Sequence, residues 1–380
     1  MRIIISAGKY FLNFMYTIIK ILPVQDKIVF LSRQHDESNV DFNLMENQLH
    51  NDYPDYKIVV LTKMIHKGLW AKFSYFFHML RQMYYLATSR VAILDTYCIT
   101  VSILHHKKTL KVVQLWHAIG AFKKFGYSIL DKEEGSSRFM AELMQMHENY
   151  DYVCTSSKYT APFFAEAFNV PMSKMIIKPL PRLDCILQAA YQEDKIKEIF
   201  KHYPELQNSG KKIILYAPTF RKDDTDMQKP VNELLNYIDQ DEYFLIIKLH
   251  PLTKQNITGN GFLQDEHFNT LDMCLLADYV ITDYSAIVYE AALLKKPLFF
   301  YAFDYSTYAM KRDFYIDYDH DMPQRIMYTA KEIAEAVKSD DYDMDRIETF
   351  INQNVEKPVT TYTKDICDFI FENCLKKDSL

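Results

Sequence analysis

The sequence predicts an α/β protein made of two doubly wound domains. Short apolar runs of strand length alternate with longer helical stretches, which is typical of parallel sheets covered by helices on both faces. The alternation stops once, at a charged segment that begins at Pro179, and it restarts at Lys212. A length of 380 residues suits two domains of ordinary size. We therefore expect two sheets that face a cleft, where ligands bind most often.

The domain boundaries are expected at residue 23 and between residues 180 and 181. Residues 1–23 form a separate helix, residues 24–180 the first α/β domain, and residues 181–380 the second domain with terminal helices. Arg182 and Asp184 lie where the chain would cross from the first α/β domain to the second, which predicts a hinge with a local ion pair at this crossing. The expected strands are 27–31, 57–62, 91–95, 110–115, 152–156, 175–178, 212–217, 244–249, 279–282 and 297–302. The expected helices are 41–51, 70–88, 136–148, 160–168, 231–238, 285–294, 330–338 and 346–375, the last with a break at Pro358.

Residues 1–22 predict a basic amphipathic helix with three basic residues and no acidic one. The apolar stripe contains Ile4, Phe11, Met15, Ile18 and Leu22, and the polar stripe contains Ser6, Lys9, Asn13, Thr17 and Lys20. Two polar residues interrupt the apolar run, which argues against a spanning helix, and no cleavage site follows, which argues against a signal peptide. Such a helix either lies in the interface of an anionic membrane or docks on its own domain, and we expect the membrane.

The composition limits the classes of function. A net charge of −6 argues against a nucleic-acid partner. Six scattered cysteines lack zinc-ligand spacing, which indicates buried reduced thiols. With only eight glycines, neither a GxGxxG nor a Walker A motif can be assembled, so any nucleotide must be held without a glycine-rich cradle. We expect neither a metal nor a cofactor.

His117 is the central candidate for chemistry. The strand 110–115 ends just before it, and Trp116 and His117 open the following loop. Ligands bind at the carboxyl ends of strands in open α/β sheets, and a histidine can move protons near neutral pH.

The second half of the chain places polar residues at further strand ends. Arg221 follows a strand and a proline turn, where it either binds phosphate oxygens or closes a surface loop. His250 follows the next strand and is either functional or structural. Asp283 ends a strand, and Ser285 is a natural N-cap for a helix whose free N–H groups would bind an anion, although capping alone explains it. Glu290 either reaches a ribose hydroxyl or is a surface acid, and the second is slightly favoured.

The order and spacing of these stretches resemble one family, the CDP-glycerol glycerophosphotransferases of wall teichoic acid synthesis. The resemblance runs from about Val91 to Tyr305 and rests on Trp116-His117, Ala217-Pro-Thr-Phe-Arg221, Lys248-Leu-His-Pro251 and the run from Ile281 to Tyr301. The short chain and its amphipathic start most resemble the family's primase, which adds a single unit. One departure is Ala118, where many members have glycine; a positive φ there would strain an alanine.

The resemblance implies a glycosyltransferase-B-like fold of two Rossmann-like domains facing a cleft. It implies transfer of glycerol phosphate from CDP-glycerol to an undecaprenyl-diphosphate-linked disaccharide, with release of CMP. The N-terminal domain would bind the acceptor and the C-terminal domain the donor. A relative that uses CDP-ribitol, polymerises, or builds another surface polymer is the alternative. The enzyme would act at the cytoplasmic face of the cell membrane as a peripheral protein, and its oligomeric state stays open.

The resemblance also implies roles for the site residues. His117 is the general base for the attacking hydroxyl, and His250 balances charge on the pyrophosphate as its bond breaks. The donor-binding set is Arg221, Thr253, Asp283, Ser285 and Glu290. Lys123 and Lys124 either bind the acceptor's pyrophosphate or form a solvated face. A sugar-nucleotide glycosyltransferase is disfavoured by the missing glycine-rich loop, and an inactive membrane scaffold by the presence of both histidines.

Overall fold

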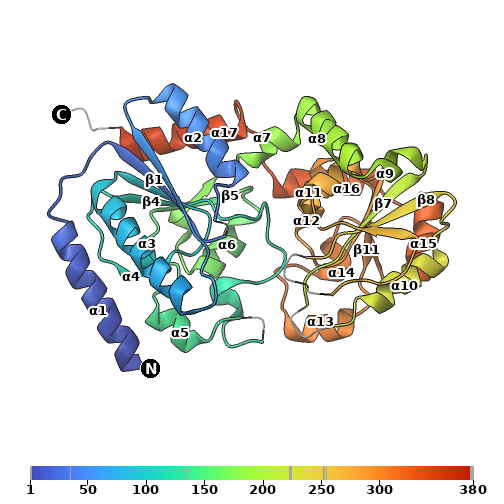
Figure 1. Cartoon of the computed structure of the whole chain (residues 1–380), viewed down its shortest axis with the longest axis horizontal. Helices are drawn as coiled ribbons and strands as arrows, with labels where there is room; N and C mark the ends of the chain where they lie inside the picture. The colour runs from blue at the N-terminus through green and yellow to red at the C-terminus, as the bar shows by residue number, and fades with distance from the viewer. Residues whose placement is uncertain are drawn as a thin grey trace. The chain divides into compact units, whose positions relative to one another are not determined.

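The computed structural model describes residues 2–34, 36–133, 135–221, 225–250, 253 and 255–376. The chain forms two compact units (Figure 1). The N-terminal unit contains Met1–Ala118, Lys124–Asp184 and Glu356–Leu380, and the C-terminal unit contains Ile119–Lys123 and Cys185–Val355. Each unit is built on a parallel sheet of six strands, and the predicted fold class is confirmed.

The N-terminal sheet has the strand order β2-β1-β3-β4-β5-β6. Its strands are β1 (Lys27–Ser32), β2 (Lys57–Thr62), β3 (Val91–Leu94), β4 (Lys111–Gln114), β5 (Tyr152–Thr155) and β6 (Met175–Ile177). Its helices are α1 (Arg2–Ile19), α2 (Val40–Asp52), α3 (Leu69–Thr88), α4 (Ile99–Ile103), α5 (Arg138–Leu143), α6 (Ala161–Phe168) and α17 (Tyr362–Ile370). The chain winds outward in both directions from the boundary between β1 and β3, which is therefore the switch point of this sheet.

The C-terminal sheet has the order β12-β11-β10-β7-β8-β9, with its switch point between β7 and β10. Its strands are β7 (Lys212–Ala217), β8 (Tyr243–Ile247), β9 (Phe262–Gln264), β10 (Tyr279–Thr282), β11 (Leu298–Tyr301) and β12 (Ile326–Met327). Its helices are α8 (Ala189–His202), α9 (Pro204–Asn208), α10 (Gln228–Tyr237), α11 (Thr270–Leu276), α12 (Ile287–Leu293), α13 (Tyr305–Lys311), α14 (Tyr318–Asp321), α15 (Ala330–Lys338) and α16 (Met344–Asn354).

Burial explains which strands the sequence predicted. Every residue of β1, β3, β10 and β11 is buried, because parallel strands in the middle of such a sheet are covered on both faces. Their apolar runs are therefore continuous and easily recognised. The edge strand β9 is only three residues long and half-buried, and β12 has two residues. Neither was predicted.

The domain boundaries differ from those expected at residues 23 and 180/181. The crossing lies after Asp184, within helix α7 (Arg182–Ile186). The C-terminal segment from Glu356 returns to the N-terminal unit, because α17 packs on α2 there. The ring of Tyr53, which follows α2, stacks on Phe371 with centroids 4.0 Å apart. Packing between segments so distant in sequence leaves no local signal in the chain.

The predicted ion pair between Arg182 and Asp184 is wrong, since residues two apart on a helix do not face each other. Arg182 pairs instead with the buried Asp41 of α2, donating from its backbone N–H (2.7 Å) and from its guanidinium Nε (2.8 Å). Asp184 accepts from the backbone N–H groups of Tyr362 (2.9 Å) and Thr363 (2.8 Å) at the start of α17. The crossing is thus fixed to two helices of the N-terminal unit.

The helix expected at 136–148 is shorter in the structure, where α5 spans only Arg138–Leu143. Gln145, His147 and Asn149 follow with positive φ. The Asn149 amide donates to backbone carbonyls at the end of α4, which stabilises this non-helical turn.

Helix α1 is present as predicted, and its polar side contacts the protein. Lys9 Nζ donates to the carbonyl of Leu143 (2.8 Å), and Asn13 Nδ2 to that of Ile103 (2.9 Å). Tyr16 is fully buried, while large apolar side chains of α1 remain exposed. In the part of the chain that the structure describes, no helix combines the length and apolar character needed to cross a bilayer.

Candidate functional site

The loop that carries His117 leaves β4 through a strained residue. Trp116 has φ +62°, a left-handed conformation that is costly for a bulky side chain. Aromatic packing holds it there: the indole stacks on Phe125 at 5.4 Å and meets the edges of His147 and Phe168. This turn directs the chain away from the sheet immediately before His117.

Ala118 is not among the residues with positive φ, so the strain expected at this alanine is absent. The left-handed residue lies two positions earlier, at Trp116. The substitution of the family's usual glycine therefore has no backbone cost here.

The ring of His117 lies at the switch point of the N-terminal sheet. Its Nδ1 is 3.0 Å from the carbonyl oxygen of Asp95, which follows β3, and 3.1 Å from the position assigned to the amide nitrogen Nε2 of Gln34, which follows β1. A carbonyl oxygen only accepts, so Nδ1 carries the proton. The Gln34 contact is compatible with this if the amide presents its oxygen, a choice set by the hydrogen-bond network. The ring lone pair then lies on Nε2, where a base needs it.

Asp95 is a buried acid that the sequence did not single out. Burial raises its pKa to about 6, although hydrogen bonds from Ser32 and Thr96 oppose that shift. Asn39 Nδ2 donates to its Oδ2 at 2.7 Å. These contacts hold the end of β3, and with it the carbonyl that accepts from His117.

Residues 119–123, directly after the histidine loop, belong to the C-terminal unit. Gly120 lies against the ring of Tyr289, where an added Cβ would be 2.5 Å from Cζ, so only glycine fits. Phe122 packs among aromatic rings that include Phe314, and Lys123 forms an isolated antiparallel bridge with Phe314. Lys123 and Lys124, predicted to act together, therefore belong to different units.

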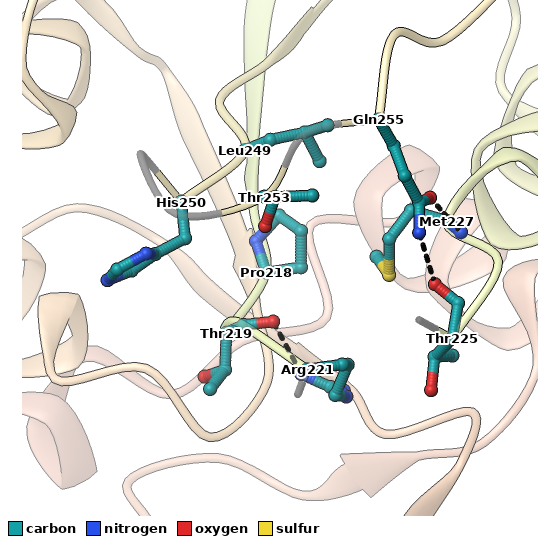
Figure 2. A pocket seen from close by; sticks show the side chains of 9 residues that line it. All are labelled: Pro218, Thr219, Arg221, Thr225, Met227, Leu249, His250, Thr253 and Gln255. Carbon is teal, nitrogen blue, oxygen red and sulfur yellow. Dashed lines mark hydrogen bonds between the residues drawn. The ribbon is translucent and has the colours of Figure 1, made fainter. Parts of the chain in front are cut away.

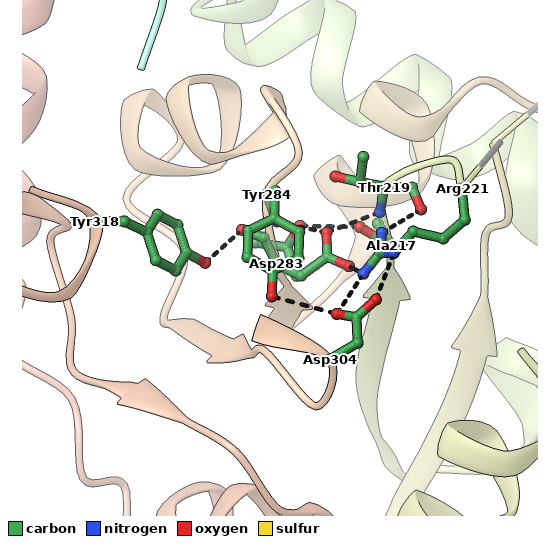
Figure 3. Close-up of polar contacts among 8 residues, drawn as sticks. Ala217, Thr219, Arg221, Asp283, Tyr284, Asp304 and Tyr318 are labelled. Carbon is green, nitrogen blue, oxygen red and sulfur yellow. Dashed lines mark hydrogen bonds and ion pairs between the residues drawn. The ribbon is translucent and has the colours of Figure 1, made fainter. Parts of the chain in front are cut away.

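Arg221 is buried in a network of carboxylates at the switch point of the C-terminal sheet (Figure 3). Its Nε donates to Asp304 at 2.8 Å, its Nη2 to Asp283 at 2.8 Å, and its Nη1 to the carbonyl of Thr219 at 2.7 Å. Its side chain is only 5% exposed, which rules out the surface-arginine alternative. Burial opposes the guanidinium charge, but Asp283 and Asp304 outweigh it and raise the pKa of Arg221 above its usual value. The guanidinium is thus the counter-charge of two carboxylates.

Asp283 is fully buried and acts as the centre of this network. Besides the guanidinium, it accepts from the backbone N–H of Thr219 (2.8 Å) and from its own neighbour Tyr284 (2.6 Å). It therefore ties the loop after β7 to the end of β10. Asp304 was not predicted, because it follows a different strand and lies 83 residues from Arg221 in the chain.

A pocket with an empty volume of about 240 Å³, open to solvent, lies beside this network (Figure 2). Three predicted residues line it: Arg221 after β7, and His250 and Thr253 after β8. The backbone N–H of Thr253 donates to the carbonyl of His250 at 2.8 Å. The other lining residues are Pro218, Thr219, Thr225, Met227, Leu249 and Gln255. Of these, Pro218 and Thr219 lie inside a motif that the sequence singled out, and Leu249 lies inside another.

His250 also lines this pocket, and in Figure 2 its ring lies to one side, apart from the side chain of Arg221. Burial, and then the charge of Lys123, lower its pKa, so the ring is neutral near pH 7. Lys248, two residues earlier, pairs at 2.7 Å with the buried Asp265 and so stabilises the end of β8. Pro251, the last residue of this motif, lies outside the described residues.

Ser285 and Glu290 lie on or near α12. The helix begins at Ile287 and has Ala286 as its N-cap residue, with no side-chain capping bond. The prediction that Ser285 is the N-cap is therefore wrong, and its Oγ accepts only a long bond from Ile287 (3.4 Å). Glu290 is half-buried in the first turn. Within the described ranges, no group of histidine, cysteine or acidic residues is arranged to hold a metal ion.

Two parallel sheets with polar loops at their switch points define the class: a two-domain, glycosyltransferase-B-like α/β protein. Comparison with known proteins gives the family. The sequence model described as "CDP-Glycerol:Poly(glycerophosphate) glycerophosphotransferase" matches residues 14–372, so the chain belongs to this family of teichoic acid transferases. The resemblance found in the sequence motifs is confirmed.

Among curated relatives, the teichoic acid ribitol-phosphate primase of Bacillus spizizenii is 32% identical over 361 residues, covering 92% of each chain. The teichoic acid glycerol-phosphate primase of Bacillus subtilis is 31% identical over 270 residues, covering 69% of this chain and 68% of that one. The chain spans only 57% of the poly(ribitol-phosphate) polymerase of Bacillus spizizenii, at 28% identity. A solved structure of the wall teichoic acid polymerase TagF has a TM-score of 0.74 at 18% identity, covers 98% of this chain and 97% of that one, and shares the fold.

Proposed function

We propose that the protein is a primase of teichoic acid synthesis, which transfers one alditol phosphate from a CDP-alditol to a lipid-linked disaccharide. The observation that carries this proposal is a histidine at the carboxyl end of a strand in each unit, His117 after β4 and His250 after β8. Two of the relatives that match over two thirds or more of their length are primases, which supports a single addition.

In the proposed reaction, His117 removes the proton from the acceptor hydroxyl through Nε2. The hydroxyl oxygen then bonds to the β-phosphorus of the donor, and the bond between that phosphorus and the bridging oxygen of the pyrophosphate breaks, so that CMP leaves. The backbone carbonyl of Asp95 keeps the proton on Nδ1 and stabilises the imidazolium that forms. The acceptor would bind the N-terminal unit.

The C-terminal unit would hold the donor. Because His250 is neutral near pH 7, it would stabilise the leaving group by donating a ring N–H rather than by a full charge. Lys123 would supply positive charge on the same side, since it belongs to the same unit as His250. Lys124 stays the candidate for the acceptor's pyrophosphate.

The remaining donor-site predictions divide into two kinds. Thr253 lines the pocket and would contact the donor, and Ser285 and Glu290 would meet its phosphates or ribose. Arg221 and Asp283 would act indirectly, by holding the loop from Pro218 to Arg221 at the pocket wall.

The alditol of the donor has two candidates, glycerol and ribitol. The sequence motifs favour glycerol. Ribitol is favoured by one observation, the similarity to a ribitol-phosphate primase over 92% of both chains.

CMP release from CDP-glycerol and from CDP-ribitol, with a soluble analogue of the lipid-linked disaccharide, tests the proposal. Release with one donor, and mass spectrometry showing a single added unit, is the expected result. Release with neither donor would overturn it, and a long product would replace the primase with a polymerase.

A further inference from the structure

Arg33 directly follows β1 and lies at the carboxyl edge of the N-terminal sheet, beside the switch point between β1 and β3. Its backbone N–H donates to the hydroxyl of Thr96 at 3.3 Å, which ties it to the loop after β3. Its guanidinium Nη1 donates to the backbone carbonyl of Tyr97 at 3.0 Å, and Cζ lies over the Tyr97 ring, 5.6 Å from the centroid. These contacts hold the side chain at the edge where ligands bind in open α/β sheets.

The guanidinium of Arg33 is half-buried and has no carboxylate partner among the residues that the structure describes; its buried Nε also lacks a hydrogen-bond partner there. Asp95, the acid that follows β3, binds the side-chain amide of Asn39 instead (2.7 Å). Arg90 and Arg182, two half-buried arginines of the same unit, each pair with an aspartate. A charge that is partly removed from water needs a counter-charge. Arg33 is therefore suited to an anionic ligand.

Arg33 and His117 bind the same short stretch of backbone. The carbonyl of Asp95 accepts from the imidazole at 3.0 Å, and the carbonyl of Tyr97 accepts from the guanidinium. Two residues of chain span at most about 7 Å. Gln34, the residue after Arg33, lies 3.1 Å from Nδ1 of the histidine. A ligand whose hydroxyl meets His117 therefore has its neighbouring groups close to this guanidinium, and in the proposed reaction that ligand is the acceptor.

We propose that Arg33 binds a phosphate group of the acceptor. The proposal rests on the proposed function, in which the N-terminal unit binds a lipid-linked acceptor, and it names the residue that recognises the charge of that acceptor. A guanidinium has five N–H donors in a planar fork that matches phosphate oxygens, and the carbonyl of Tyr97 occupies only one of them. The phosphate is either the diphosphate that joins the disaccharide to the lipid or a phosphate that the acceptor already carries beside its reacting hydroxyl.

Calorimetric titration of the full chain with three soluble acceptor analogues tests the proposal without any reaction. The first analogue is the disaccharide as an uncharged alkyl glycoside. The second carries a diphosphate at the alkyl end, and the third carries a glycerol phosphate at the end with the reacting hydroxyl. Arg33→Met should raise the Kd of a phosphate-bearing analogue at least about tenfold, because a charge-assisted hydrogen bond is lost. The Kd of the uncharged analogue should change by less than about twofold.

Arg90→Met is the matched control. Arg90 is also half-buried but directly precedes β3, at the opposite edge of the sheet, and it pairs with Asp26. Its loss should change the Kd of all three analogues alike. Arg33→Lys keeps the positive charge without the planar fork, so it should recover part of the affinity for the phosphate-bearing analogue. Packing of Arg33 on the ring of Tyr97 alone would give no such dependence on the phosphate of the ligand.

A rise in Kd confined to the second analogue would assign the diphosphate at the lipid end, and one confined to the third would assign a phosphate beside the reacting hydroxyl. An equal effect of Arg33→Met on all three analogues, or no effect on any, would overturn the proposal. A raised KM for the CDP-alditol with the uncharged acceptor would assign Arg33 to the donor and overturn it as well. The titration needs no donor. Absence of CMP release with intact phosphate-dependent binding would therefore refute the proposed reaction and leave the role of Arg33 standing.

Discussion

Replacing Arg221 by methionine should separate a structural role of this residue from direct phosphate binding. Methionine keeps much of the length of the side chain but leaves Asp283 and Asp304 without their counter-charge. Asp283 is completely buried and the side chain of Asp304 is 16% exposed. Removing one partner of a buried pair costs about 3–5 kcal/mol, and the partial exposure of Asp304 favours the lower end, about 3 kcal/mol.

The assay is hydrogen exchange of β7 and β10, the strands that the network joins, together with urea unfolding. The control is Arg325→Met, which breaks an ion pair to Asp341 whose two side chains are 58% and 59% exposed, and which should cost at most about 1 kcal/mol. The deficit of the Arg221 variant should shrink as the pH is lowered from 7 towards 4, since protonation relieves stranded carboxylates.

A loss of less than about 1 kcal/mol with a raised KM for the donor would refute this reasoning. That result would support the role first expected from the sequence, in which the guanidinium of Arg221 binds phosphate oxygens of the donor directly.

Three further predictions concern the N-terminal unit. His117→Ala should lower kcat at least about a hundredfold, while the control His50→Ala, at an exposed position of α2, should not; a near-normal rate of CMP release would exclude His117 as the base. Gly126→Ala should destabilise the fold by more than about 1–2 kcal/mol, because φ is +57° and the new Cβ would meet a backbone carbonyl oxygen at 2.2 Å. Gly210→Ala has a similar φ of +64° in open space, so an equal loss of thermal stability in both would show that the contact is unimportant. Burial lowers the pKa of His147 from 6.5 to about 3, so the unfolded chain binds a proton that the folded chain does not below pH 6.5. This contribution to stability is complete above pH 6.5 and falls by about 1.4 kcal/mol per unit as the pH drops towards 3; an unchanged pH slope of Tm in His147→Asn would contradict it.

The sequence predicted the two sheets because their central strands are continuous apolar runs, and it placed His117 and His250 correctly at strand ends. It did not predict β9 and β12, whose two or three residues lie at sheet edges.

At the candidate site, the sequence could not predict the partners of Arg221. An arginine after a strand looks the same whether it is open to a ligand or surrounded by acids, and Asp304 follows another strand, 83 residues further along the chain. The expected backbone strain at Ala118 is absent for a similar reason. A motif shows which residue is unusual, but the positive φ belongs to Trp116, whose conformation depends on aromatic contacts with residues 125, 147 and 168.

The return of residues 356–376 to the N-terminal unit has a consequence for synthesis on the ribosome. Helix α17 covers α2, and the Tyr53 hydroxyl donates to Asp368 at 3.1 Å. Until α17 emerges, the side of α2 that it covers stays exposed, although the whole segment from Cys185 to Val355 is already made. The C-terminal unit is thus translated, apart from residues 119–123, as an uninterrupted segment before the N-terminal unit is complete. The N-terminal unit, whose synthesis begins first, is therefore the last to complete its fold. It stays accessible to chaperones and proteases for longer than the C-terminal unit.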